Sequence, residues 1–351
     1  MPASSRRVLA GAAVLVGLAT WGCRDEDRAI AEPHVPDHGG AVVPLDVGGL
    51  PAETGAFSIA GQQLAVAAGP GLAFGRDGKL ARTFEGHDSA VTAVAWAPDN
   101  QRIAMGAVDG TVRVWGRSPI AVRRLPSEGG AVRDVSWSPD GTRLATVEGS
   151  GVLVMRDHLD PGVLSTFVAA DHDVRACVWS PDSGRHVATQ DGGGALLFVG
   201  DELAGVLPGQ ARAPVAWSPD GARVAVGGAV YDGATGALLR DLSAGSVSAV
   251  AFSPDGATLL TAGATARTWD VATGTPRLEL GPAVDAAFRP DGQRIATAGA
   301  DGVHVWHAVG GELWSETTGA ADALAWSPDG ALLAIFSRTG PPRIWDVTEL
   351  R

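Results

Sequence analysis

Lysine, cysteine and tyrosine are scarce in this sequence, and its acidic residues outnumber its basic ones. Lys79 is the only lysine among 351 residues, which include 2 cysteines and 1 tyrosine. The 39 aspartates and glutamates exceed the 27 lysines and arginines, so the formal net charge is −12. Because contacts to phosphates need a basic surface, we expect no nucleic acid among the partners.

The motifs of common catalytic and cofactor sites are also missing. The sequence contains no G-x-S-x-G, no H-E-x-x-H, no paired C-x-x-C and no G-x-x-x-x-G-K. The glycines after Asp191 lack the alternating acids of a calcium loop, and the histidines are scattered without ligand spacing. We therefore predict a protein that is not an enzyme, with no catalytic, cofactor-binding or metal-binding residues.

The apolar run near the N-terminus is too short to span a membrane. It covers 14 residues, 8–21, whereas a spanning helix needs about 20. Arg6 and Arg7 precede it and Gly22-Cys23 follows it, which is the anatomy of a signal peptide. A small residue before a cysteine at this point resembles the lipobox of bacterial lipoproteins. The resemblance implies that residues 1–22 are removed and that Cys23 receives a lipid.

Two alternatives remain open for this segment. Thr20 and Trp21 stand where lipoproteins prefer leucine and a small residue, so an ordinary secretory signal is one alternative. The arginine pair also resembles a twin-arginine export signal. We expect a bacterial cell-envelope lipoprotein facing the periplasm or the cell surface. Arg24, in place of an aspartate after the lipidated cysteine, favours the outer membrane.

Residues 23–41 are expected to form a tether. They are charged, contain proline and glycine, and show no apolar period, which is typical of a solvated linker. The other cysteine, Cys177, occupies an apolar position of the repeats described next, so we expect it to be a small buried residue. With Cys23 lipidated, the chain has no partner for a disulfide.

One recurring pattern organises residues 42–351. In residues 132–145 an alternating apolar run ends at Trp137, continues with Ser-Pro-Asp-Gly and is followed by a second apolar run. Period-2 alternation indicates a half-buried strand. Proline favours the first corner of a turn, aspartate bonds back to the backbone, and glycine takes the left-handed exit. The pattern therefore predicts a β-hairpin.

The hairpin pattern recurs in seven clear copies, 35 to 42 residues apart, and in one worn copy. Each copy continues with a third apolar run, usually ending in a second aromatic residue, and most continue with a fourth. The aromatic residues that end the first runs are Phe57, Trp96, Trp137, Trp179, Trp217, Phe252, Phe288 and Trp326.

These units resemble WD40 repeats. The namesake Trp-Asp pair stands at residues 269–270 and 345–346, and the opening Gly-His pair at residues 86–87. The resemblance implies an all-β fold, a β-propeller of four-stranded antiparallel blades. The buried His–Ser/Thr–Trp–Asp network of the family is nowhere complete, since Met105 lies where the second unit should have serine or threonine.

Eight units predict eight blades, with seven as the second choice if the worn first unit is a cap. The last unit ends with its third strand near Trp345, whereas residues 41–47 form a spare strand before the first unit. Pairing of this N-terminal strand with the last blade would close the propeller. We expect a monomeric ring.

Candidate partner-binding residues occupy a position that varies between the units. Arg133 and Arg175 lie four residues before the aromatic residue in adjacent units, and Arg212 lies near the next. In the resembled family this strand begins near the mouth of the ring where partners dock, so these arginines are predicted to form a basic patch. Glu53 and Asp322 occupy the same position in the first and last units. The alternative is that all five residues only keep the surface soluble.

Trp314 is the tryptophan of the repeats that fits neither the first-run nor the third-run position. It lies in an expected fourth strand, on the rim of a blade. An exposed tryptophan there is a candidate partner contact, and a buried one that packs on a loop is the alternative.

A rigid ring with exposed loops and no catalytic group is suited to docking, and the WD40 resemblance implies protein partners. The predicted function is therefore a lipid-anchored, extracytoplasmic, non-catalytic protein-interaction scaffold that contacts the membrane only through its lipid. One alternative is an enzyme, or a carrier of a small ligand or metal, that uses the central channel. The other is a purely structural envelope role without a discrete partner.

Overall fold

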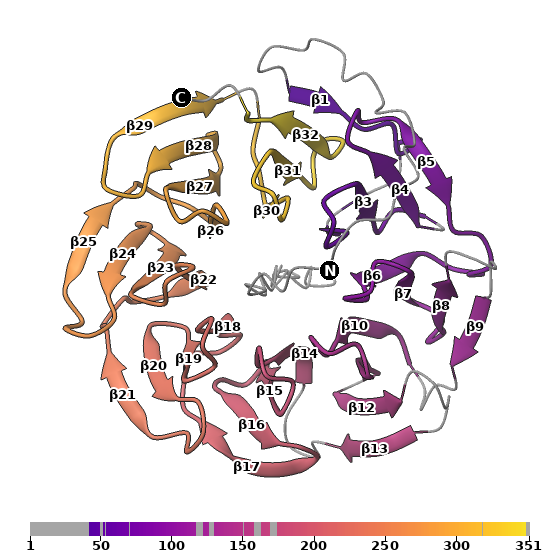
Figure 1. The fold of residues 1–351 in the computed structure, drawn as a ribbon, viewed down its shortest axis with the longest axis horizontal. Coiled ribbons are helices and arrows are strands. Elements are labelled where there is room, and N and C mark those ends of the chain that lie inside the picture. Colours follow the sequence, from indigo (N-terminus) through magenta and orange to yellow (C-terminus); the bar gives the residue numbers. More distant parts are fainter. Residues whose placement is uncertain are drawn as a thin grey trace, which may run out of the picture.

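The computed structural model describes residues 42–49, 52, 54–69, 71–116, 122–125, 130–149, 151–157, 163–168, 174–317 and 319–348. They form eight four-stranded antiparallel sheets, which are the blades of one ring (Figure 1). The predicted eight-bladed β-propeller is confirmed, and the second choice of seven blades is wrong. No helix among these residues has the length and apolar character needed to cross a membrane. The predicted signal peptide, Cys23 and the tether lie outside the described residues.

The strands of blades 1 to 7 follow one another from the channel to the rim (Figure 1). The innermost strands are β2 (Gly55–Phe57), β6 (Val91–Trp96), β10 (Val132–Trp137), β14 (Val174–Trp179), β18 (Val215–Trp217), β22 (Val247–Phe252), β26 (Asp285–Phe288) and β30 (Ala323–Trp326). The second strands are β3 (Gln63–Val66), β7 (Arg102–Ala107), β11 (Arg143–Glu148), β15 (Arg185–Gln190), β19 (Arg223–Val226), β23 (Thr258–Gly263), β27 (Arg294–Gly299) and β31 (Leu332–Phe336).

The outer half of each blade completes the sheet. The third strands are β4 (Leu72–Gly75), β8 (Val112–Gly116), β12 (Val152–Asp157), β16 (Ala195–Val199), β20 (Ala229–Asp232), β24 (Arg267–Asp270), β28 (Gly302–His307) and β32 (Arg343–Asp346). The outermost strands of blades 1 to 8 are β5 (Leu80–Thr83), β9 (Val122–Leu125), β13 (Val163–Val168), β17 (Glu202–Leu207), β21 (Leu238–Asp241), β25 (Pro276–Glu279), β29 (Glu312–Glu316) and β1 (Val42–Pro44).

Blade 8 takes its outermost strand from the other end of the chain, as predicted. β1 pairs antiparallel with β32, with Val42 opposite Trp345 and Val43 opposite Ile344. The N–H of Leu45 then donates to the carbonyl of Pro342 at 2.8 Å. The two ends of the described chain thus belong to one sheet, which closes the ring.

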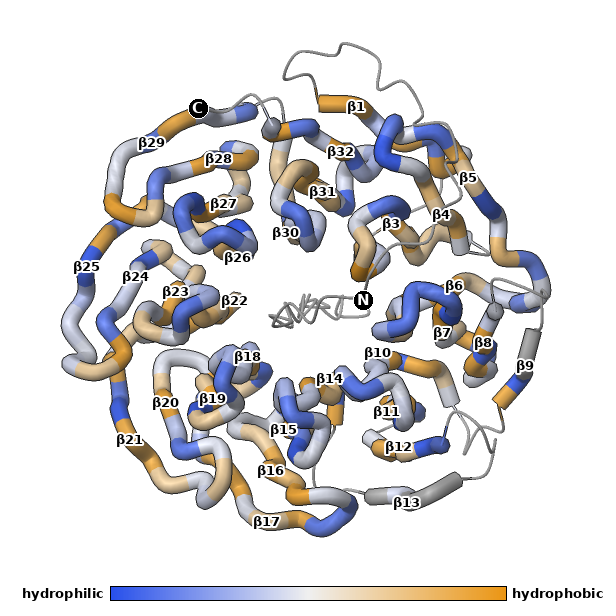
Figure 2. The backbone as a smooth tube through the Cα atoms, in the orientation of Figure 1, coloured by the Kyte–Doolittle hydropathy of each residue, from blue (hydrophilic) through white to orange (hydrophobic). Residues whose placement is uncertain are grey.

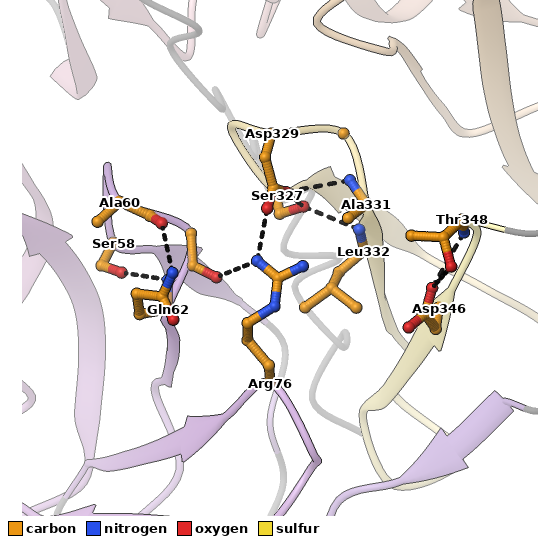
Figure 3. Close-up of polar contacts among 12 residues, drawn as sticks. Ser58, Ala60, Gln62, Arg76, Ser327, Asp329, Ala331, Leu332, Asp346 and Thr348 are labelled. Atoms are coloured by element: carbon orange, nitrogen blue, oxygen red, sulfur yellow. Dashed lines mark hydrogen bonds and ion pairs between the residues drawn. The ribbon is translucent and has the colours of Figure 1, made fainter. Parts of the chain in front are cut away.

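An ion pair also crosses the junction between the first and last blades (Figure 3). Nη1 of Arg76, in the turn between β4 and β5, lies 2.5 Å from Oδ2 of Asp329 in the turn between β30 and β31. The same nitrogen donates to the carbonyl of Gly61 at 3.2 Å, and the hydroxyl of Ser327 donates to Asp329 at 2.6 Å. Burial alone would raise the pKa of Asp329, but the Ser327 and Arg76 hydrogen bonds outweigh it, and the pKa lies below its usual value.

The Ser-Pro-Asp-Gly turns adopt the structure that their residues predict. In blade 3 the hydroxyl of Ser138 donates to Asp140 at 2.5 Å and accepts the N–H of Arg143 at 2.9 Å. Gly141 has a φ of 69°, in the left-handed region that glycine adopts without strain. The serine–aspartate bond recurs in Ser180–Asp182, Ser218–Asp220, Ser253–Asp255 and Ser327–Asp329. Each of these turns fixes the register of its hairpin.

A row of large side chains crosses each blade from its first to its third strand. The rows are Phe57–Leu64–Phe74, Trp96–Ile103–Trp115, Trp137–Leu144–Arg156, Trp179–His186–Phe198, Trp217–Val224–Tyr231, Phe252–Leu259–Trp269, Phe288–Ile295–Trp306 and Trp326–Leu333–Trp345. The row of blade 5 packs against Val187 and Leu197 of blade 4. The core therefore lies between blades, and no single blade buries its apolar face alone. Figure 2 shows further hydrophobic stretches on the rim, on β17 and β21.

Tryptophan side chains also link neighbouring innermost strands through hydrogen bonds. Nε1 of Trp179 donates to the carbonyl of Ser136 at 3.2 Å, and Nε1 of Trp217 donates to that of Val178 at 3.1 Å. Trp96 and Trp326 make the equivalent bond. Each acceptor directly precedes the aromatic residue of the previous blade. Among the described residues, Nε1 of Trp137 is buried without such a partner.

Blade 3 has Arg156 where every other blade has an aromatic third member. The Arg156 and Glu148 side chains are both 0% exposed, and their ion pair measures 2.7 Å. Thr146 donates to the same Glu148 oxygen at 2.7 Å and accepts from Arg156. This buried cluster was not predicted from the sequence, although the absence of an aromatic residue at position 156 was a visible signal.

The hydrogen-bond network of blade 2 is more complete than the sequence indicated. Nδ1 of His87 lies 2.8 Å from Oγ1 of Thr111, whose hydroxyl donates to Asp109 at 2.7 Å. The ring of His87 lies 5.4 Å from that of Trp115. Met105, at the position expected for serine or threonine, is fully buried. Thr111 therefore supplies the hydroxyl from a different position in the blade.

Candidate docking site at the mouth of the ring

The first residues of neighbouring innermost strands lie side by side at one end of the ring, which we call the mouth. Oγ1 of Thr92 donates to the carbonyl of Val132 in the next blade at 2.6 Å. Nη1 of Arg133 donates to the carbonyl of Val174 at 3.3 Å. The position that varies between repeats thus provides hydrogen-bond donors between blades, in addition to facing solvent. Sequence reasoning missed this role because the acceptor is a backbone carbonyl of the next repeat.

The three predicted arginines come together at the mouth across blades 3 to 5. Nη1 of Arg175 lies 2.6 Å from Oδ1 of Asp191, and Nε of Arg212 lies 2.9 Å from the same oxygen. Arg133 is exposed and reaches the backbone of Val174, next to Arg175. Two guanidinium groups therefore share one carboxylate, and the third lies at the neighbouring strand.

The loop that carries Asp191 reaches Arg212 because glycines follow it. A Cβ on Gly194 would lie 2.4 Å from the carbonyl oxygen of Leu207, so only glycine allows this approach. On the other side, the amide of Gln210 is bonded to the backbone N–H and carbonyl of Val247 in blade 6. These contacts hold the segment before β18 against the Asp191 loop. Arg212 itself has a φ of 56°, which is uncommon for a residue other than glycine.

Asp322 lies at the mouth in blade 8, away from the arginines. It accepts the backbone N–H of Arg338 at 2.8 Å, and the Arg338 guanidinium lies 3.7 Å from its other oxygen. The structure therefore does not bring Asp322 into the arginine cluster. Glu53 lies outside the described residues. The partner-binding role of all these residues stays a prediction.

Trp314 is half-buried on β29 of blade 7. Its ring stacks on that of Trp345 in blade 8, with the centroids 3.7 Å apart and an interplanar angle of 20°. Val42 of β1 packs in the same cluster. Trp314 thus packs across a blade junction and not on a loop, and its role as a partner contact stays a prediction.

Two aspartates of the inner wall were not recognised in the sequence. Asp134 in blade 3 accepts the N–H of Cys177 at 2.9 Å, and Asp285 in blade 7 accepts that of Leu324 at 2.8 Å. Each carboxylate thus joins its strand to the next innermost strand. Burial raises the pKa of both to about 6, although backbone hydrogen bonds oppose the shift. Alanine stands at the equivalent position of four other repeats, so an aspartate at this position could have been recognised as unusual from the sequence.

The described residues contain no group of three or more His, Cys, Asp or Glu side chains arranged to hold a metal ion. His304 lies 3.2 Å from Asp301 and 2.9 Å from Glu312 on the rim of blade 7. Cys177 is a free, buried thiol, 4% exposed, as its apolar repeat position predicted. Burial, and secondarily the charge of Asp134, raise the pKa of this thiol well above its usual value.

Comparison with known protein families agrees with this geometry. The family model "WD domain, G-beta repeat" matches residues 78–116, 120–155 and 236–270. The chain contains WD40 repeats. Each match spans the outermost strand of one blade and the first three strands of the next.

A solved structure shares the β-propeller fold. The β-propeller domain of Cps50 (Swd1) from Myceliophteria thermophila matches with a TM-score of 0.58 and 19% identity. The match covers 75% of this chain and 98% of that one, and at this identity it shows the fold alone. A search of curated protein sequences finds no match. A WD40 propeller suggests a protein-interaction scaffold.

Proposed function

We propose that this WD40 propeller is a non-catalytic docking platform for a protein partner, anchored outside the cytoplasm through a lipid on Cys23. The observation that carries the docking proposal is the clustering of three arginines on consecutive blades at the mouth: Arg175 and Arg212 share Asp191, and Arg133 reaches the backbone of Val174 beside them. Such an arrangement favours an acidic segment of the partner, because guanidinium groups bind carboxylates in a fixed, often bidentate geometry.

Cross-linking in cells tests the docking site. A photo-reactive residue at Ser248, a half-buried mouth position in blade 6, should give one discrete protein adduct. Replacing Arg133 and Arg212 with glutamate should abolish that adduct. The matched control is Arg240→Glu on the rim, where the guanidinium donates to the carbonyl of Ala272. An adduct that persists in the double variant, or its absence in the unmodified chain, would contradict docking at this mouth.

The lipid anchor has its own test. Cys23→Ala should move the protein from the membrane fraction to the soluble fraction, because no other lipid site is predicted. An unchanged membrane fraction would contradict the anchor without affecting the docking site. A stoichiometric, tightly held metal in the purified protein would instead favour the alternative of an enzyme or carrier that uses the channel.

A further inference from the structure

Ring closure removes the open edge at the end of the chain, but among the described strands the outermost one of every blade still has one backbone edge without a strand neighbour. Most of these strands carry residues that discourage pairing with another chain, namely arginine, proline or two glutamates. Those strands are β1, β5, β9, β21, β25 and β29. β13 and β17 are the exceptions, and the only charged residue in β17 is Glu202.

β17 combines this open edge with exposed aliphatic side chains. Leu203 is 45% exposed and Val206 is 56% exposed, and Figure 2 shows the hydrophobic character of the strand on the rim. Ala204 and Gly205 lie between them, so the middle of the strand is small enough for another backbone to approach. Natural proteins rarely leave such a strand uncovered.

A β-bulge places Leu203 and Val206 on the same face of the blade. Leu203 pairs with Phe198 and Val206 pairs with Leu196, and the register shifts between these two pairs. Phe198 and Leu196 belong to one core cluster, so the residues opposite them share that face. Without the bulge, residues three apart on a strand would point to opposite faces.

We propose that β17 pairs antiparallel with β17 of a second copy of this chain, about a two-fold axis between Ala204 and Gly205. In this register Leu203 lies opposite Val206 of the second copy, and the pair occurs twice. Because both residues project from the same face, the four side chains form one apolar cluster across the axis. A two-fold contact must be self-complementary, and the side-chain pattern of β17 satisfies that requirement.

The charges of the strand fit this register. Glu202 falls opposite Leu207, and the two copies of Glu202 are five residues apart along the pair, roughly 17 Å. That distance exceeds the Debye length of about 8 Å at physiological salt. The overall charge of −12 on each copy still opposes association at low salt, so the dimer should become tighter as salt concentration rises.

Blade 5 extends the apolar surface beside β17. Leu238 is 58% exposed and Leu239 is 39% exposed on β21. The turn before β21 touches the end of β17, since a Cβ on Gly236 would lie 3.1 Å from Leu207. Leu207 belongs to the core shared with blade 5, so these leucines lie beside the face of β17 opposite Leu203 and Val206.

Sedimentation velocity tests the proposal on the mature chain with Cys23→Ser, which leaves buried Cys177 as its one cysteine. We expect a dimer that dissociates on dilution and is tightened by salt. Val206→Lys should weaken it roughly tenfold or more, because the change removes an apolar contact twice. Leu80→Lys, at a position 53% exposed on β5 of blade 1, is the matched control and should leave the dimer unchanged.

A cysteine pair tests the register. A mixture of Leu203→Cys and Val206→Cys chains should form a disulfide-linked dimer, and either variant alone should form much less. A monomer at all concentrations up to the sub-millimolar range, as the sequence analysis expected, would overturn the proposal. So would a dimer that Val206→Lys does not weaken. Neither result would affect the proposed docking site at the mouth, which the cross-linked adduct from Ser248 tests independently.

Discussion

The guanidinium of Arg76 lies 2.5 Å from the carboxylate of Asp329, although 253 residues separate them in the sequence. The contact joins the first and last blades. These are the only neighbouring blades of the ring that do not follow one another along the chain. The ion pair acts beside the pairing of β1 with β32. The ring thus closes through this exposed ion pair, the short strand β1 and an apolar core that the two blades share, and the ion pair and the strand should differ in strength.

The ion pair is expected to contribute little. The side chain of Asp329 is 45% exposed, and exposed ion pairs contribute about 1 kcal/mol or less. Arg76→Ala should therefore lower the free energy of unfolding by less than about 1 kcal/mol, and the loss should shrink at high salt. Urea unfolding at two salt concentrations measures it. A larger, salt-independent loss would mean that the hydrogen bond of Arg76 to Gly61 dominates.

The short strand should matter more. Val42 packs in the cluster of Trp314 and Trp345, so Val42→Asp brings a charge into an apolar contact. We expect a loss of about 1–2 kcal/mol and a change in tryptophan fluorescence from the stacked pair. Val309→Asp is the control, because Val309 is 90% exposed. Equal losses for the two variants would contradict a role of β1 in closing the ring.

The indole bonds between blades can be tested with two tryptophans of the same repeat position. Trp179→Phe removes the bond to the carbonyl of Ser136 and should cost about 1–2 kcal/mol beyond the lost packing. Trp137→Phe should cost less, since Nε1 of Trp137 is buried without a partner among the described residues. Chemical denaturation of both variants gives the comparison. A greater loss for Trp137→Phe would rule out the hydrogen bond as the cause.

The buried ion pair of blade 3 predicts a strong coupling. Glu148→Gln removes the charge of the carboxylate that pairs with the buried Arg156 guanidinium and should cost about 3–5 kcal/mol. Combining Arg156→Trp with Glu148→Gln restores the aromatic row of the other blades and should recover most of that loss. A double-mutant cycle from thermal unfolding measures the coupling. Additive losses would show that the two residues act independently.

The inner-wall aspartates predict a pH dependence of stability. The pKa of Asp134 is about 6 in the folded protein against a usual value of 3.8. The fold therefore favours the protonated carboxyl of Asp134 over the ionised one. The stability that this preference contributes is fully present below about pH 4 and is lost as pH rises through about 6. Relative to Asp134→Asn, the unmodified protein should lose about 1 kcal/mol of stability between about pH 5 and pH 7.

Asp140→Asn is the control for this measurement. Burial would raise the pKa of Asp140, but hydrogen bonds from Ser138 and Thr142 outweigh it and the pKa is lowered. Its contribution is present at neutral pH and is lost only in more acidic solution, so its difference from the unmodified protein should stay constant over the same pH interval. Urea unfolding at both pH values gives these differences, and a stability difference between Asp134→Asn and the unmodified protein that does not change with pH would contradict the raised pKa.

The hairpins, the number of blades and the way the ring closes could all be predicted from the amino-acid sequence. These features depend on local chemistry repeated eight times: alternation sets each strand, Ser-Pro-Asp-Gly sets each turn, and the count of aromatic residues such as Trp137 sets the blades. The last unit lacks a fourth strand after Trp345, and a spare strand lies at Val42. Because an open edge needs a partner, the two strands could be predicted to pair.

Which side chains meet, within a blade and between blades, could be seen only in the folded protein. Thr111 supplies the hydroxyl that was expected at position 105. Arg156 forms a buried ion pair with Glu148, and Asp191 binds two arginines from different blades. Contacts between blades join residues about forty positions apart, or from opposite ends of the chain. Their partners depend on the exact approach of neighbouring sheets, which no local pattern in the sequence specifies.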